Sequence, residues 1–74
     1  REEHWTIIRG NAKVVLGGSI VDVYPGKYVY IPKECKHQII NDSDKNLVLS
    51  EVQLGDYFGE DDIQRYSDKY GRLD

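Results

Sequence analysis

The sequence is poor in several residues that would define common protein classes. Its 74 residues include a single cysteine, Cys35, so no internal disulfide framework can form. One reduced thiol fits a reducing compartment, and we expect a cytoplasmic location. No stretch approaches the roughly 18 apolar residues of a membrane span, and no secretory signal is visible. The lack of cysteine pairs and of long apolar runs indicates a small protein that is neither stabilised by disulfides nor embedded in a membrane.

The sequence also lacks a basic stripe. Residues 1–55 balance seven acidic against seven basic side chains, whereas residues 56–74 carry six acidic and three basic ones. The net charge of −3 therefore comes entirely from the C-terminal segment. Nucleic acid binding depends on clustered lysine and arginine, so neither nucleic acid nor a membrane surface is an expected partner.

Methionine is absent altogether, and the chain opens within the polar run "REEHW". We interpret this as a piece of a longer protein. A chain of 74 residues forms one domain at most and buries only about 60% of the surface that its unfolded form exposes. The core is expected to be thin.

What is present is a series of short β-rich runs separated by turn residues. Gly10-Asn11 and Gly17-Gly18 predict hairpins, because glycine and asparagine accept the positive φ of tight turns. Pro32 ends another run, because proline cannot donate to a β-ladder. The six expected strands cover residues 5–9, 12–16, 19–24, 28–31, 37–41 and 47–54. This spacing is typical of an all-β antiparallel sandwich or barrel.

The C-terminal segment has a different pattern. Ile63, Tyr66 and Tyr70 recur at helical spacing, which predicts a short helix within residues 59–72, packed on the sheet by its aromatic side chains. We therefore divide the chain into a partial β-barrel, residues 1–55, and an acidic tail with a short helix, residues 56–74.

Two spaced patterns resemble the signatures of the cupin superfamily. Gly26, Pro32, His37 and Asn41 match the second signature, and Glu3 with Gly10 matches the end of the first. The resemblance implies a jelly-roll barrel in which Glu3 and His37 are two ligands of one divalent metal. A histidine pair lying before Arg1 would supply the others. The sequence departs from the signature at Glu34, where glycine is usual.

The residue types suit a metal independently of that resemblance. Imidazole and carboxylate ligands accept Zn, Mn, Co or a similar divalent ion, and two ligands alone hold it weakly or not at all. The alternatives are a strand histidine without a ligand role for His37 and an exposed terminal charge for Glu3. His4 adjoins Glu3 and should face the opposite side of the strand, in a packing role.

A narrower resemblance covers nearly the whole chain. The segments "EHW" near the start, "YIP" with the following histidine, "EVQLGDYFGEDDIQR" and "DKYGR" look like the C-terminal domain of type II phosphomannose isomerases. These are bifunctional mannose-6-phosphate isomerase / mannose-1-phosphate guanylyltransferase enzymes. The resemblance implies metal-assisted interconversion of mannose 6-phosphate and fructose 6-phosphate through an enediol, in GDP-mannose biosynthesis. We expect a sugar phosphate ligand and a homodimer, and no activity from these 74 residues alone.

Candidate residues for that chemistry are a base and a phosphate anchor. Glu51 is the candidate base, although an outward-facing position on a half-polar strand is the favoured alternative. Arg72, Lys36 and Arg65 are candidate phosphate ligands, with Arg72 first because arginine binds phosphate in a bidentate manner. For Arg72 the alternative is a C-terminal helix charge in solvent.

A second function of a different class stays open. The chain would then be a non-catalytic cupin module for sugar binding or dimerisation, attached to a sugar-nucleotidyltransferase. No glycine-rich phosphate loop appears, so guanylyltransferase chemistry would lie outside these residues. The sequence before Arg1 discriminates between the two functions, because only the enzyme needs the histidine pair.

Overall fold

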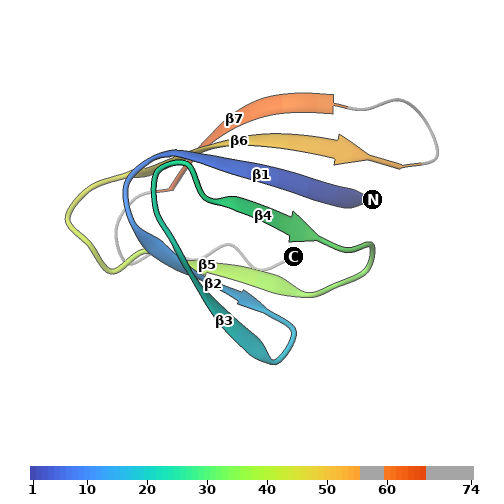
Figure 1. The fold of residues 1–74 in the computed structure, drawn as a ribbon, viewed down its shortest axis with the longest axis horizontal. Coiled ribbons are helices and arrows are strands. Elements are labelled where there is room, and N and C mark those ends of the chain that lie inside the picture. Colours follow the sequence, from blue (N-terminus) through green and yellow to red (C-terminus); the bar gives the residue numbers. More distant parts are fainter. Residues whose placement is uncertain (56–59, 67–74) are drawn as a thin grey trace.

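The computed structural model describes residues 1–55 and 60–66 and shows an all-β architecture (Figure 1). Within those residues the strands are β1 (Glu2–Arg9), β2 (Ala12–Leu16), β3 (Ser19–Val23), β4 (Tyr28–Ile31), β5 (His37–Ile40), β6 (Leu47–Leu54) and β7 (Glu60–Tyr66). Strands β2 to β6 match their expected ranges to within one residue, whereas β1 begins three residues earlier than expected. None of these residues lies in a helix long and apolar enough to cross a membrane.

The strands form two sheets. The larger has the order β4-β1-β6-β7 and the smaller the order β3-β2-β5, and every paired neighbour is antiparallel. Figure 1 shows the two sheets facing each other, with the start of β1 and the ends of β4 and β6 at one edge. The expected all-β, cupin-like antiparallel fold is confirmed.

The core lies between the sheets and follows the two-residue alternation of the strands. The buried side chains come from both sheets, as period 2 requires when one face is covered. The hydrophobic side chains exposed by 2% or less are Trp5, Ile7, Val14, Val23, Ile31, Ile39, Leu47 and Leu49. Burying each such side chain stabilises the fold by roughly 1.5–3 kcal/mol.

The helix expected within residues 59–72 is wrong where the structure describes it. Glu60–Tyr66 forms strand β7, which pairs with β6 so that Leu47 lies opposite Tyr66 and Glu51 opposite Asp62. The edge of β6 offers a row of backbone donors and acceptors, and pairing with them outweighs a weak helical periodicity. The large sheet therefore continues past residue 55, while Tyr70 and the rest of the expected helix lie outside the described residues.

Of the two expected hairpins, the one at Gly17-Gly18 is confirmed, because β2 pairs with β3 from Ala12–Val23 to Leu16–Ser19. The other is wrong. β1 and β2 belong to different sheets, so Gly10-Asn11 is a corner between the sheets. Gly10 adopts φ +92°, and a Cβ there would lie 2.6 Å from the carbonyl oxygen of Asn46. Only glycine fits this conformation and this close backbone approach.

The turn between β4 and β5 explains the usual glycine at position 34 of the cupin pattern. The backbone N–H of Cys35 donates to the carbonyl of Pro32 at 3.1 Å, which closes a four-residue turn. Glu34 is the third residue of this turn and has φ +64°. Type II turns require a positive φ at that position, which favours glycine. Glu34 makes the same turn under backbone strain.

Replacing Glu34 with glycine is expected to raise the free energy of unfolding by about 0.5–1 kcal/mol. Relief of the left-handed conformation contributes about 1–2 kcal/mol, and the greater freedom of glycine in the unfolded chain offsets part of it. Urea unfolding measures the change, with Glu34→Ala as the control that removes the charge and keeps the strain. A glycine variant no more stable than the alanine variant would contradict the strain assignment.

Candidate functional site

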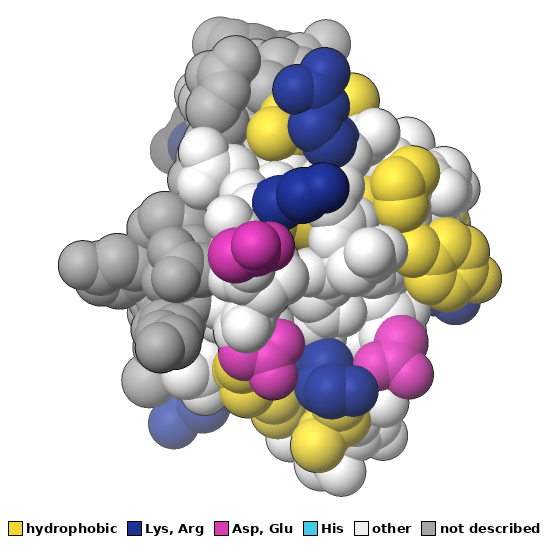
Figure 2. Space-filling model, turned by 90° about the vertical axis from the view of Figure 1, so that its left-hand side faces the viewer, with side chains coloured by type: hydrophobic (Ala, Val, Ile, Leu, Met, Phe, Trp, Pro, Cys, Tyr) yellow, Lys and Arg dark blue, Asp and Glu magenta, His cyan; other side chains and the backbone are white. Residues whose placement is uncertain are grey.

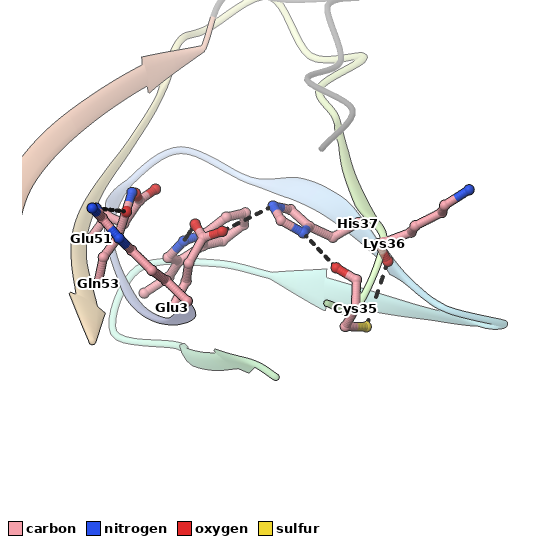
Figure 3. Close-up of polar contacts among 8 residues, drawn as sticks. Glu3, Cys35, Lys36, His37, Glu51 and Gln53 are labelled. Carbon is pink, nitrogen blue, oxygen red and sulfur yellow. Dashed lines mark hydrogen bonds and ion pairs between the residues drawn. The ribbon is translucent and has the colours of Figure 1, made fainter. Parts of the chain in front are cut away.

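Glu3 and His37 meet between the two sheets. Glu3 lies on the inner face of β1, and His37 is the first residue of β5, with a side chain only 4% exposed. Their Oε2 and Nε2 atoms are 3.6 Å apart. Figure 3 shows the two side chains pointing toward one another. His37 Nδ1 lies 3.2 Å from the carbonyl oxygen of Cys35 and must donate to it, because a carbonyl only accepts. In the neutral ring, the lone pair of Nε2 therefore faces Glu3.

Trp5 holds both members of this pair, and sequence reasoning missed it. Its indole Nε1 donates to Glu3 Oε1 at 3.1 Å. Its ring meets the His37 ring edge-on, at 5.4 Å between centroids and 77° between planes. The available signal was strand alternation, because Trp5 lies two residues after Glu3 and so shares its face.

Glu51 points into the interior from β6. It is 1% exposed, so the favoured alternative of an outward-facing residue is wrong. Leu47 and Leu49 precede Glu51 by four and two residues, and the same alternation buries all three. Gln53 donates from Nε2 to Glu51 Oε2, whereas Glu51 Oε1 has no hydrogen-bond partner among the residues that the structure describes.

The electrostatics of Glu3 reflect its position between these groups. Burial raises the pKa of Glu3 above the ordinary value of 4.5, and the nearby Glu51 carboxyl raises it further. The hydrogen bond from Trp5 opposes this rise, and so does the positive charge of His37 when its ring is protonated, because both favour the charged carboxylate. The balance of these effects holds the pKa of Glu3 above its usual range, with burial as the largest cause.

The stability of the fold should depend on pH through Glu3. A carboxyl whose pKa is raised on folding contributes stability that is fully present below pH 4.5 and is lost as pH rises through the raised value. Glu3→Gln removes this titration, so the variant should gain stability relative to the wild type as pH rises from 4.5 towards 7. Urea unfolding at a series of pH values measures the difference. A constant separation between the two curves would contradict the assignment.

A cavity of about 300 Å³ opens beside Glu3 and His37 at the edge of the sandwich where β1 begins. Its wall includes Lys36, one of the three expected phosphate ligands, and also Arg1, which sequence reasoning had not singled out. The other two candidates are not brought to it by any described contact. Arg65 lies on β7 opposite Val48, and Arg72 lies outside the described residues.

The end of the sandwich opposite the cavity has a mixed-charge surface. Figure 2 views that end and shows basic and acidic side chains interspersed rather than separated by sign. Lys13 and Asp22, for example, form an ion pair of 2.7 Å. His4 also lies away from the cavity, as expected: it faces out from β1, next to Tyr28 and Tyr30 and 2.8 Å from Glu2 Oε2.

Glu3 and His37 are ligand types that bind divalent metals, but two ligands are too few for a complete metal site. One imidazole nitrogen and one carboxylate oxygen converge, which is the ligand chemistry of Zn, Mn and Co sites. Within residues 1–55 and 60–66, no group of three or more histidine, cysteine or acidic residues is arranged to hold a metal ion. Glu3 and His37 therefore fit two positions of a metal site that needs further ligands.

Two antiparallel sheets with an inward-facing histidine and glutamate at one end define a cupin-like β domain. Within that class, the chain belongs to the family described as mannose-6-phosphate isomerase C-terminal, which matches residues 1–68. No solved structure matches the chain.

The curated relatives are similar to this chain over only a small part of their own length. A mannose-1-phosphate guanylyltransferase of Salmonella montevideo is 47% identical over 72 residues. The xanthan biosynthesis protein XanB of Xanthomonas campestris (strain B100) is 42% identical over 72 residues, and the alginate biosynthesis protein AlgA of Pseudomonas putida is 39% identical over 72 residues. Each alignment covers 97% of this chain and 15% of the relative.

Proposed function

We propose that the chain is part of a mannose-6-phosphate isomerase domain, which interconverts mannose 6-phosphate and fructose 6-phosphate for GDP-mannose biosynthesis. The observation that carries the proposal is the convergence of His37 Nε2 and Glu3 Oε2 at 3.6 Å beside an open cavity, with Glu51 buried on the same sheet face as Glu3. The family match supports the reaction class.

Glu3 and His37 would hold a divalent metal such as Zn, Mn or Co, with further ligands from sequence preceding Arg1. When bound, the metal polarises the oxygens at C1 and C2 of the sugar and stabilises the negative charge that develops there. The chain's own contribution is to aim the two ligands. The hydrogen bond from His37 to the Cys35 carbonyl and that from Trp5 to Glu3 set their orientation.

Glu51 is the proposed general base. The reaction moves a proton from C2 of the aldose to C1 of the ketose. The electron pair left on C2 forms the C1=C2 double bond of the enediol while the carbonyl oxygen at C1 takes up a proton. When C1 is protonated, the carbonyl forms at C2 and the hydroxyl there releases its proton, so the protons balance. A carboxylate that takes the C2 proton and returns it to C1 leaves the enzyme unchanged. Glu51 supports this role because it is an interior carboxyl whose Oε1 accepts no hydrogen bond from the described residues.

The basic residues Lys36 and Arg1 line the cavity together with the acidic Glu3 and Glu34. Lys36 is a proposed ligand of the substrate phosphate, and Arg65 and Arg72 remain predicted anchors. We further propose a cytoplasmic homodimer. Tyr28, Tyr30 and Leu54 are 40–54% exposed on the outer face of the large sheet and offer an apolar surface for pairing. The same surface would serve the second candidate function, a non-catalytic module for sugar binding or dimerisation.

The test uses the full-length protein that carries these residues, assayed for bound divalent metal and for isomerisation of mannose 6-phosphate. His37→Ala should lower metal affinity by more than the roughly 10–100-fold typical of an outer-shell change, and isomerisation should fall with it. His4→Ala is the matched control, because this neighbouring histidine faces the opposite side of the sheet. A protein that binds metal through His37 yet leaves mannose 6-phosphate unchanged would overturn the isomerase and favour the binding module.

A further inference from the structure

Gln53 joins two groups of opposite charge at the proposed site. It lies on β6 opposite Glu3, and its side chain shares the inner face with Glu51 two residues earlier. Its Nε2 donates to Glu51 Oε2 (Figure 3). Its Oε1 accepts from a guanidinium nitrogen of Arg1 at 3.2 Å. The amide therefore spans from a buried carboxylate to a cation that lines the cavity.

The chemistry of these partners permits one orientation of the amide. A carboxylate only accepts hydrogen bonds and a guanidinium only donates them, so reversing the amide would lose both contacts. Glutamate at position 53 would keep the acceptor for Arg1 and lose the donor for Glu51. Leucine would keep much of the volume and lose both. Glutamine has the length and the polarity to serve both partners at once.

Glu51 depends on this contact for its orientation. It is 1% exposed, and its Oε1 has no hydrogen-bond partner in the described part of the chain. The Gln53 amide holds Oε2, and the neighbouring Glu3 carboxyl also bears on the Glu51 carboxyl. Of the two, only the amide keeps its donor whatever the state of ionisation, so Gln53 sets the carboxyl plane. A functional carboxylate must be held within about 0.5 Å of its productive position, and a neighbouring hydrogen bond is the usual means.

We propose that Gln53 is a positioning residue that holds Glu51 with Oε1 aimed into the interior for proton transfer. This rests on the proposed function, in which Glu51 is the general base. Gln53 itself does not exchange a proton with the sugar. Its effect passes through Glu51, and the contact with Arg1 fixes the amide that makes it possible.

The kinetic test compares Gln53→Leu and Gln53→Glu in the full-length protein. Both should lower kcat roughly 10–100-fold, the loss typical when an outer-shell hydrogen bond is removed, with KM within about twofold of the wild type. Gln38→Leu is the matched control, because Gln38 is half-buried on β5 and lies opposite Val15, away from the cavity. The control should retain wild-type kcat.

A double variant separates positioning from general stability. If Gln53 acts through Glu51, adding Gln53→Leu to Glu51→Gln should change the residual kcat less than about twofold, whereas independent effects would multiply. The side-chain amide resonances of Gln53 in a ¹⁵N NMR spectrum give a readout independent of activity, and Glu51→Gln should shift them.

The outcomes distinguish this inference from the proposed function. An active wild type with unchanged kcat in Gln53→Leu, or with effects that multiply in the double variant, would overturn the positioning role and leave the isomerase intact. Gln53 amide resonances that ignore Glu51→Gln would overturn the contact itself. A wild type that does not isomerise mannose 6-phosphate would overturn the proposed function, and the positioning role with it.

Discussion

Gly10→Ala is expected to lower the free energy of unfolding by about 3 kcal/mol or more. The residue has φ +92°, where an L side chain is strained by about 1–2 kcal/mol. The new Cβ would also lie 2.6 Å from the Asn46 carbonyl oxygen and 3.1 Å from Leu47 Cα. Both are backbone atoms, and forcing them apart adds roughly 1–3 kcal/mol. In so small a domain, the sum is a large share of total stability.

Two other glycines make the measurement selective. Gly17 has φ +56° and open space where a Cβ would lie, so Gly17→Ala tests the conformational part alone. Gly18 has neither a positive φ nor a close neighbour and serves as the neutral reference. Urea unfolding followed by Trp5 fluorescence compares the three variants. Equal losses for Gly10→Ala and Gly17→Ala would show that the approach of β6 to this corner is not tight.

Glu51→Gln is expected to separate activity from stability. As the proposed general base, Glu51 should contribute roughly 10²–10⁴ to the rate of isomerisation, and the amide cannot accept a proton at neutral pH. The same change removes a buried carboxylate that lies beside Glu3. Replacing a buried charge with a neutral group of similar volume is often stabilising, and we expect a gain of about 1 kcal/mol.

The two readouts are isomerisation of mannose 6-phosphate by the full-length protein and its unfolding in urea. Glu2→Gln is the control, because Glu2 lies next to Glu3 on β1 and its side chain faces outward to His4. It should leave the rate unchanged. Loss of both rate and stability in Glu51→Gln would indicate that Glu51 holds the fold rather than serving the reaction.

The sequence predicted most strands because their signals are local. Alternation of apolar residues and the glycine at Gly17-Gly18 locate strands and a hairpin without any knowledge of the partner sheet. The meeting of Glu3 with His37 was implied by the resemblance of their surroundings to the two cupin signatures around Gly10 and Pro32. The burial of Glu51 could also have been predicted, by counting in steps of two from Leu47.

The remaining features depend on contacts distant in sequence. The corner at Gly10 has the same residues as a hairpin, and only the assignment of β1 and β2 to different sheets distinguishes them. In β7, the spacing of Ile63 and Tyr66 suits a helix, and the free edge of β6 decides for a strand. The contact from Gln53 to Arg1 joins residues 52 positions apart, which no local pattern indicates.

The burial of Trp5 also determines which side chains of β1 face the cavity. Residues 2–5 read Glu-Glu-His-Trp, so both faces of β1 carry a glutamate: Glu3 within 3.6 Å of His37 inside, and Glu2 within 2.8 Å of His4 outside. A slip of β1 by one residue would deliver the outer pair to the cavity. That slip would also move the Trp5 indole from the core to the solvent. In the observed register the indole is only 1% exposed, and it is among the largest apolar groups that a fold can bury. The burial of Trp5 thus fixes the register of β1. Core packing thereby decides that Glu3, rather than Glu2 and His4, faces the cavity.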